Sequence, residues 1–451
     1  MDDADPLNWP TWKKTVNLTL VAFHGMMATF TAASIQCAFV DIAKDLNVSV
    51  QRTSYLSSLV IVVLGGTPLL WRPLAHVYGR RPIFLLGLLC SLVGNIGCAV
   101  SPSFASQALC RAIAAFFICP AAILGSAVVS ECFFRKERAR HIGIWTIMFT
   151  LGVPIAPFIF GFVAMRVGYR WIYWILAITN GVQFILHFFF GPETRYIPSR
   201  NIDKPPSNSF RRQYFTFGRI DPTPLTLHDF VHPLSYITNP NVVIAAAAYA
   251  MIFLFGSIMT TFEIPQIFPA KFGLDTQQVG LQYLSVIVGT VIGEQFGGIA
   301  SDKWMWQREK KGLAPKPEHR LWLSYGGYLL TICGLVVFLV QIDRASDEWN
   351  VTPIVGAAIA AAGNQLVTTV MITYAVDCHP DDAAAIGVFI AVIRQGWGFI
   401  GPFWFPIMIQ DIGLLNSAAV VTALIVGVSM LPTMLLQWKG GAWRKQRAGD
   451  L

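Results

Sequence analysis

Long apolar stretches follow one another at short intervals along nearly the whole chain. Each is close to the length of about 20 residues with which an α-helix crosses about 30 Å of hydrocarbon. Because lipid offers no partner for backbone polar groups, stretches of this length can span a bilayer only as helices. The sequence therefore predicts an all-α membrane protein with twelve transmembrane helices, at about 16–40, 54–71, 83–100, 106–130, 142–165, 171–190, 241–262, 279–300, 321–341, 353–375, 384–409 and 413–436.

Composition excludes the main alternative classes. Charged residues make up 13% of the chain and hydrophobic residues 54%, whereas soluble domains carry about 25% charged residues. Eight cysteines in 451 residues are too sparse for a disulfide scaffold. The net charge of +8 is spread over short segments between apolar stretches, so we expect no nucleic-acid partner. Phosphate-loop, zinc-hydrolase and serine-hydrolase motifs do not occur in the sequence, and we therefore expect no enzyme activity, no cofactor and no metal.

The distribution of basic residues predicts the orientation. With a cytoplasmic amino terminus, 25 Lys and Arg residues fall in inside segments and 6 in outside segments. Cytoplasmic loops carry such an excess, so we expect both termini in the cytoplasm. The first apolar stretch is too long for a signal-peptide core, and we expect no cleavage.

The longest polar segment divides the twelve stretches into two sets of six. It covers about 191–240 and contains Pro205-Pro206 and Asp221-Pro222-Thr223-Pro224, a composition typical of a linker. We predict a first half at 1–190, a cytoplasmic linker at 191–240, a second half at 241–436 and a cytoplasmic tail at 437–451. Two sets of six spans are typical of a two-halved transporter.

The segment between the second and third stretches, Trp71–Pro82, resembles the Gly-x-x-x-Asp-x-x-Gly-Arg-Arg signature of the major facilitator superfamily. Gly79, Arg80 and Arg81 match it, while Arg72 replaces the first glycine and His76 the aspartate. In the superfamily this loop latches the two halves together on the cytoplasmic side, so the resemblance implies a gating role. With His76 in the aspartate position we expect a weaker or pH-sensitive latch. Alternatively, the two arginines only anchor the topology.

Two further positions complete the predicted gate. The second-half counterpart, Gly298-Ile299-Ala300-Ser301-Asp302, keeps both the glycine and the aspartate. Glu131, at the cytoplasmic end of the fourth stretch, is expected near Arg80 and Arg81. An exposed ion pair is worth only about 0–1 kcal/mol, which suits a reversible contact.

The fifth stretch is rich in glycine and proline, with Gly152, Pro154, Pro157 and Gly161. It resembles the antiporter motif of the superfamily's drug:proton exporters. Small residues let helices approach closely and prolines bend them, so this stretch can serve as a packed pivot. Asp5–Pro10 is similar to the motif that precedes the first span in fungal members of that branch. Gly191–Thr194 is similar to the acidic motif that follows the sixth span in the superfamily.

The resemblance implies two pseudo-symmetric six-helix halves that export small organic molecules, such as drugs, toxins or secondary metabolites, in exchange for protons. We expect a monomer that works by alternating access, in the plasma membrane, with the vacuolar membrane as the alternative. Proton-coupled uptake of a small organic cation or nutrient remains open, because the same fold runs in both directions. A sensor derived from a transporter is a third alternative.

Ionisable and amide groups inside the stretches are the candidate site residues, because a charge there costs about 2.5–3.5 kcal/mol or more. We predict that substrate meets Arg394, Asn364, Gln365 and Arg111, although a buried ion pair for Arg394 and snorkelling for Arg111 are alternatives. We predict proton coupling at Glu294, Glu263 or His24. The alternatives are an ion pair between Glu294 and Arg394, an interfacial position for Glu263, and a hydrogen bond from His24 to a neighbouring helix.

Overall fold

The computed structural model describes residues 5–197, 209–215, 218–310, 312, 316–346 and 348–449, and within them every regular element is helical. The all-α prediction is confirmed. The helices in the first part of the chain are α1 (Thr11–Ala33), α2 (Phe39–Asp45), α3 (Val50–Gly66), α4 (Pro68–Tyr78), α5 (Arg80–Val100), α6 (Phe104–Cys132), α7 (Arg135–Val167), α8 (Arg170–Phe190), α9 (Ser209–Tyr214) and α10 (Leu227–Val231). They are followed by α11 (Pro240–Phe253), α12 (Thr260–Phe272), α13 (Thr276–Lys310), α14 (Trp322–Arg344), α15 (Thr352–Cys378), α16 (Ala383–Ile425) and α17 (Leu431–Gly449).

Most of these helices are long and apolar enough to cross a bilayer. Among the described residues ten qualify by length and composition, and the bent pair α3 and α4, which meet at 47°, makes eleven. One of the ten, Pro380–Arg444, has 65 residues, far more than one crossing requires. Its backbone is non-helical at Gly413, where φ is 78°. The described residues thus hold ten to eleven candidate spans, and the break at Gly413 lies where the sequence predicts the boundary between the last two of twelve.

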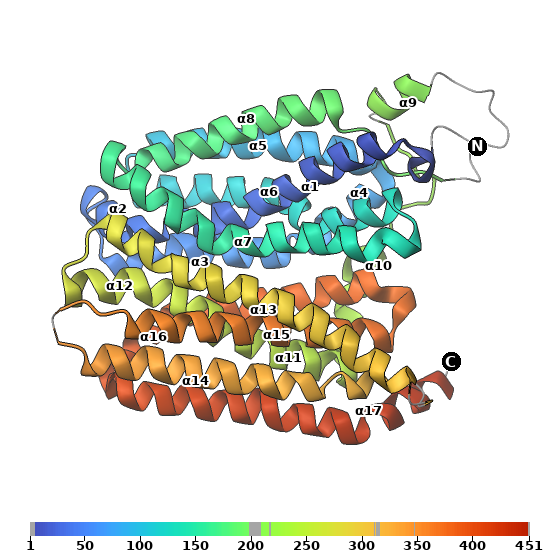
Figure 1. Ribbon diagram of the computed structural model, residues 1–451. Helices are drawn as coiled ribbons and strands as arrows, with labels where there is room; N and C mark the ends of the chain where they lie inside the picture. Colours follow the sequence, from blue (N-terminus) through green and yellow to red (C-terminus); the bar gives the residue numbers. More distant parts are fainter. Residues whose placement is uncertain are drawn as a thin grey trace. The chain divides into compact units, whose positions relative to one another are not determined.

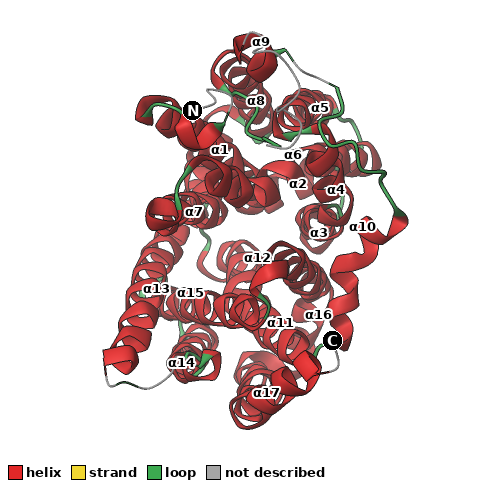
Figure 2. Cartoon of the chain, turned by 90° about the vertical axis from the view of Figure 1, so that its right-hand side faces the viewer, coloured by secondary structure: helices red, strands yellow, loops and turns green. Residues whose placement is uncertain are grey.

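The structure consists of two compact units. Figure 1 shows their helices from the side, coloured by position in the sequence, and Figure 2 shows them nearly end-on. Unit 1 comprises residues 1–35, 66–156 and 166–231, and unit 2 comprises residues 36–65, 157–165 and 232–451. In unit 1, α5 packs against α6 and α8, and α1 packs against α6. In unit 2, α13 and α14 pack against α15, and α11 packs against α15 and α16. Segment 36–65 thus joins unit 2, although it precedes most of unit 1 in the chain.

Glycines set how closely these helices approach one another. A Cβ atom at Gly334 of α14 would lie 2.3 Å from the Ala360 nitrogen of α15, and one at Gly356 of α15 would lie 2.5 Å from the Phe338 nitrogen of α14. Both distances are shorter than a carbon–nitrogen contact allows. The hairpin of α14 and α15 therefore packs backbone against backbone, as small residues permit in membrane helices.

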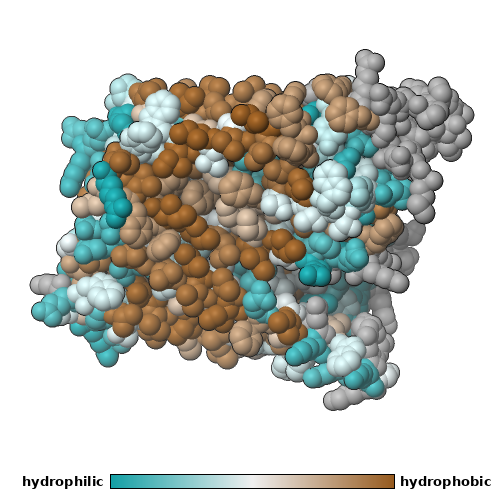
Figure 3. Space-filling view, turned by 45° about the horizontal axis from the view of Figure 1, so that its top comes forward, coloured by the Kyte–Doolittle hydropathy of each residue, from teal (hydrophilic) through white to brown (hydrophobic). Residues whose placement is uncertain are grey.

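Apolar side chains cover the outer faces of the helices. On α5 the exposed ones are Leu86, Leu89, Val93, Ile96 and Val100, a spacing of three to four residues that lines one helix face. In Figure 3 hydrophobic residues gather over the middle of the helices and hydrophilic residues at their ends. Exposed apolar surface of this extent is typical of a protein that faces lipid. The chain is a multi-pass integral membrane protein.

The second transmembrane segment continues further than the sequence predicted. We expected the span to end near residue 71 and a loop to follow to Pro82, but α4 remains helical to Tyr78 and the turn is confined to Gly79. Hydropathy marks where a helix leaves the apolar region rather than where its hydrogen bonds stop. His76 consequently lies on the last turn of a helix, one turn before the basic pair.

Candidate functional site

A single carboxylate closes the turn between α4 and α5. Glu193 Oε1 accepts hydrogen bonds from the backbone nitrogens of Arg80 (2.9 Å) and Arg195 (2.8 Å), and Oε2 accepts one from Arg81 (3.0 Å). The first backbone N–H groups of a helix have no partner within it and attract negative charge. Gly79 makes this possible, because its φ is +96° and a Cβ atom there would lie 2.3 Å from Glu193 Oε2. Burial raises the pKa of Glu193, whereas the three hydrogen bonds act in the opposite direction and lower it.

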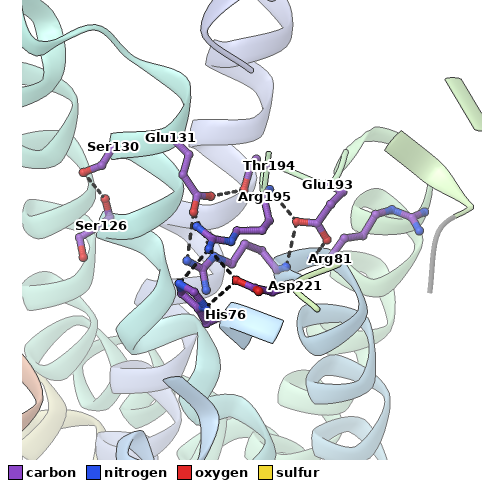
Figure 4. A network of polar contacts seen from close by, with 10 residues as sticks. His76, Arg81, Ser126, Ser130, Glu131, Glu193, Thr194, Arg195 and Asp221 are labelled. Atoms are coloured by element: carbon purple, nitrogen blue, oxygen red, sulfur yellow. Dashed lines mark hydrogen bonds and ion pairs between the residues drawn. The ribbon is translucent and has the colours of Figure 1, made fainter. Parts of the chain in front are cut away.

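Glu131, at the end of α6, lies where the sequence predicted it. Its Oε1 contacts Arg80 Nη2 at 3.0 Å and Nε at 3.3 Å, and its Oε2 accepts a hydrogen bond from Thr194 Oγ1 at 2.6 Å (Figure 4). Arg81 turns instead to the end of α8, where Nε donates to the Gly191 carbonyl (2.8 Å) and Nη2 to the Phe188 carbonyl (2.7 Å). The basic pair therefore joins α5 to two other helices of unit 1.

His76 is paired with a carboxylate from the polar segment after α9. Asp221 Oδ2 lies 3.5 Å from His76 Nδ1 and 3.5 Å from Arg195 Nη2. Arg195 Nη2 also lies 2.8 Å from His76 Nε2. Because a guanidinium can only donate, Nε2 accepts and the ring proton of neutral His76 is on Nδ1, facing Asp221. Asp221 thus supplies an acid beside the position where the signature's aspartate is replaced.

Asp221 is held in this place by its own segment. The backbone nitrogens of Ile220 and Asp221 donate to the Val77 carbonyl at 2.8 and 3.1 Å. Asp221 Oδ1 accepts hydrogen bonds from the Thr223 nitrogen (3.0 Å) and hydroxyl (2.7 Å). These bonds, together with His76 and Arg195, lower the pKa of Asp221. We refer to the connected set in Figure 4 as the arginine cluster, consisting of His76, Arg80, Arg81, Glu131, Glu193, Thr194, Arg195 and Asp221.

A small hollow opens beside the arginine cluster. Its lining includes Arg80, Arg81, Asn17 and His187. The ring of His24, on α1, lies 5.2 Å from that of His187 and 5.3 Å from that of Phe84. Both nitrogens of His24 are buried without a hydrogen-bond partner among the described residues. The predicted proton site at His24 is therefore a buried pair of imidazoles in unit 1.

Unit 2 contains a chain of polar side chains between two transmembrane helices. Gln365 Nε2 donates to Glu294 Oε2 at 3.1 Å, and Asn364 Nδ2 donates to Gln365 Oε1 at 3.1 Å. Glu294 lies on α13, and both amides lie on α15. The structure thus brings together three of the predicted site residues.

Arg394, on α16, has other partners. Its Nη1 donates to Tyr249 Oη at 2.9 Å, and its guanidinium carbon lies 4.8 Å from the ring centre of Phe253. Immediately after Phe253 the backbone forms a π-helical turn, Leu254–Met259, between α11 and α12. Such turns are frequent at functional sites. Among the ion pairs of the described residues there is none between Glu294 and Arg394, the sequence-based alternative.

The remaining predicted site residues lie apart from this chain. Glu263, on α12, is 2% exposed, and its Oε1 has no hydrogen-bond partner among the described residues. Arg111, on α6, is 2% exposed, and its Nη2 donates to the carbonyls of Thr31 and Ala32 at 3.3 and 3.4 Å. These carbonyls end α1, where a cation is favourable. Arg111 therefore stabilises the end of that helix.

The glycine- and proline-rich stretch lies on α7, with Pro154 and Pro157 both buried. A Cβ atom at Gly152 would lie 2.2 Å from Thr29 Oγ1 of α1, and one at Gly161 would lie 3.0 Å from the Gly280 Cα atom of α13. The motif thus permits two close helix contacts.

A second polar cluster lies at the ends of the helices of unit 2. Arg320 Nη2 contacts Asp377 at 3.3 Å, and Arg444 Nη2 contacts Glu318 at 3.1 Å. Asp377 ends α15 as Glu131 ends α6, the match expected of two repeated halves. Arg320 also donates to Ser301, whereas the side chain of the predicted gating residue Asp302 lies outside the described residues.

Sequence reasoning found the basic pair and Glu131 but missed the acids that organise them. Nothing assigned Asp221, Arg195 or the pair of Arg320 and Asp377 to a site. One signal was available for Asp221: the segment Trp71–Arg81 contains three arginines and a histidine without an acidic residue. This excess of positive charge predicts that a carboxylate from another segment pairs with it.

The sequence matches the model of one protein family over most of its length. The model of the Major Facilitator Superfamily matches residues 21–402. The chain belongs to the major facilitator superfamily. It is therefore a transporter of that superfamily, whose members act on small molecules within the membrane.

Relatives and solved structures agree with this membership. The superfamily transporter atr4 of Stereocaulon alpinum is 25% identical over 92% of this chain and 75% of its own length. The efflux pump radE of Floropilus chiversii is 26% identical over 97% of this chain and 82% of its own length. The xylose transporter XylE from E. coli shares the fold, with a TM-score of 0.69 at 14% identity over 95% of this chain and 98% of its own.

Proposed function

We propose that this protein is a proton-coupled secondary transporter that exports small organic molecules by alternating access. The observation that carries the proposal is the chain formed by Glu294, Gln365 and Asn364 on two transmembrane helices. A carboxyl group is costly at such a position unless it has a function or a partner. Among the described residues its hydrogen-bond partner is a neutral amide, that of Gln365, which leaves the carboxyl group able to gain and lose a proton.

The amide of Gln365 suits a group that changes its charge. Its NH₂ donates to the ionised Glu294 carboxylate, and its carbonyl can accept from the protonated form after rotation. The side chain of Asn364, which donates to the Gln365 carbonyl, then has to rotate as well. We assign proton coupling to Glu294, with Glu263 and His24 as further titratable sites on other helices.

Arg394 is our candidate for substrate recognition. Its guanidinium is half-buried, bound to one phenol and stacked near one ring. An aromatic and cationic surface binds flat organic molecules and anions. The adjacent π-helical turn allows α11 and α12 to change their relative rotation during transport.

The arginine cluster is our candidate gate. Its ion pairs lie at helix ends and are mostly buried in this conformation, so opening the gate would have to expose them to water. The distribution of basic residues supports a cytoplasmic position for this end of unit 1, and we propose the plasma membrane as the site of export. The name of radE, an efflux pump, supports export.

Transport in proteoliposomes with an imposed pH gradient tests the proposal. A panel of fluorescent organic cations, anions and neutral dyes serves as probe. We expect accumulation against the direction of proton flow for wild type, and loss of that accumulation with retained passive exchange for Glu294→Gln. The exposed Glu348→Gln is the matched control and should behave as wild type.

Two results would contradict the proposal. Accumulation in the direction of proton flow would show uptake. A Glu294→Gln variant with the wild-type pH dependence would remove Glu294 from the coupling step.

A further inference from the structure

Thr223 combines exposure with a contact to the arginine cluster. It is exposed and lies between Pro222 and Pro224, in a stretch without regular structure before α10. Its hydroxyl donates to Asp221 Oδ1 at 2.7 Å and its backbone nitrogen donates to the same oxygen at 3.0 Å. One exposed hydroxyl therefore helps to orient a buried carboxylate.

The other oxygen of that carboxylate faces the cluster. Asp221 Oδ2 lies 3.5 Å from both His76 and Arg195, and the backbone nitrogens of residues 220 and 221 bind the Val77 carbonyl. Any change in charge at Thr223 thus acts on a carboxylate that joins the segment to α4.

We propose that Thr223 is phosphorylated by a proline-directed protein kinase and that the phosphate releases Asp221 from the arginine cluster. In this step Thr223 Oγ1 attacks the γ-phosphorus of ATP, and the bond from that phosphorus to the β–γ bridging oxygen breaks. The hydroxyl proton passes to a base of the kinase, and ADP leaves. The threonine–proline pair, the exposed side chain and the irregular backbone are what such a kinase requires. The inference rests on the cytoplasmic orientation and the gate proposed above.

The modification removes one bond and adds repulsion. Thr223 loses its hydroxyl proton and so can no longer donate to Asp221. A phosphate of about −1.5 to −2 charge then lies two residues from the carboxylate. Arg219, whose Nη2 already donates to the Thr223 carbonyl, is a ready partner for the phosphate. Arg195 is attracted to the same phosphate and away from Asp221.

The chain offers a matched control three residues further on. Thr226 is also exposed, and its hydroxyl donates to Asp229 Oδ2 at 3.0 Å. Leu227 follows it instead of proline. Among the described residues no salt bridge joins Asp229 to the arginine cluster, and His76 lowers the pKa of Asp229 less than its hydrogen bonds from Thr226 do.

Phosphorylation is tested on the full-length protein in lipid nanodiscs with Mg²⁺, ATP and a purified proline-directed kinase. We expect mass spectrometry to show a phosphate on Thr223 in wild type and Thr226→Ala, none there in Thr223→Ala, and recovery in Thr223→Ser. A folded protein left unmodified at Thr223, under conditions where a synthetic peptide of residues 218–229 is modified, overturns the proposal.

Release is tested by hydrogen exchange of the backbone amides of Ile220 and Asp221. We expect about tenfold faster exchange after phosphorylation, as the loss of one charged hydrogen bond implies, and a similar increase in unmodified Asp221→Asn. Unchanged exchange in the phosphorylated protein overturns the release. Neither readout uses transport, so this inference can fail while the transport proposal stands, and the reverse.

Discussion

Glu193 differs from the other acids near it because its partners belong to the main chain. Its carboxylate binds three backbone nitrogens and fixes the turn at Gly79, whereas Glu131 binds the side chains of Arg80 and Thr194. A main-chain contact of this kind keeps the start of α5 in one conformation. We therefore expect Glu193 to act in folding and Glu131 in gating.

Glu193→Gln should lower stability by about 1–3 kcal/mol, because the amide keeps one acceptor oxygen and turns an NH₂ group towards backbone donors. Thermal unfolding of the purified protein measures the change. The exposed Glu137→Gln is the control and should unfold as wild type does. Equal melting temperatures for the two variants would contradict the structural role.

Asp221→Asn should lower stability at neutral pH, and the deficit should depend on pH. Because the pKa of Asp221 is lowered in the folded protein, its contribution is complete above the ordinary value of about 4 and disappears as the pH falls through the lowered pKa. Wild type and variant should therefore differ at neutral pH, and the difference should shrink as the pH falls below about 4. A deficit that widens on acidification would refute this assignment.

The sequence predicted only part of this site because its contacts join distant residues. Arg80 and Arg81 stand in a local motif, and their position near Glu131 follows from the order of the spans. Asp221 is 145 residues from His76, and no pattern in the linker specifies which of its acids returns to α4. Local periodicity carries no information about such a contact.

At the scale of elements, α7 is defined by its contacts with neighbours. Gly152 touches α1, and Gly161 touches α13, while Gly143 on the same helix has nothing within 4 Å of an added Cβ atom. The three glycines therefore differ in what they tolerate.

Gly152→Ala should destabilise the protein by about 1–3 kcal/mol, because the new methyl group overlaps Thr29 and the Met26 carbonyl. Gly143→Ala should be neutral or stabilising by up to about 1 kcal/mol, as expected when alanine replaces a helical glycine. Thermal unfolding in one detergent measures both. If Gly152→Ala is as stable as Gly143→Ala, the close contact with α1 is wrong.

Element boundaries were predictable where hydropathy changes sharply. The gap between 409 and 413 anticipated the break at Gly413, because a positive φ is accessible to glycine at little cost. The extension of α4 to Tyr78 and the π-helical turn after Phe253 were not predictable. Both depend on tertiary packing rather than on the apolar pattern.

For the whole molecule, the number of spans and the basic residues determine the orientation. Both termini should lie in the cytoplasm. Epitope tags at residues 1 and 451 should be accessible to antibody only after the cells are permeabilised, with a tag in the outside segment near Asn350 accessible before. Termini on opposite faces would exclude an even number of crossings.

The fold could be read from the sequence because membrane insertion depends on length and hydropathy, which are local. That residues 36–65 and 157–165 belong to unit 2 depends on tertiary contacts, which local hydropathy does not specify. Tyr55 of α3 stacks on Phe403 of α16 at 4.4 Å between ring centres. Such complementarity is absent from any pattern of apolar residues.

Most of the polar segment 191–240 belongs to unit 1. The Glu193 nitrogen binds the Gln213 carbonyl, residues 220 and 221 bind Val77, and unit 1 extends to Val231. Helix α10 then continues directly into a 3₁₀ turn, His232–Thr238, in unit 2. At this crossing the chain remains in regular structure from Leu227 to Thr238. Extra glycines between Tyr196 and Ser209 should leave transport intact, whereas the same glycines between Val231 and His232 should slow turnover, because they interrupt a continuous helical stretch at one of the places where the chain passes from one unit to the other.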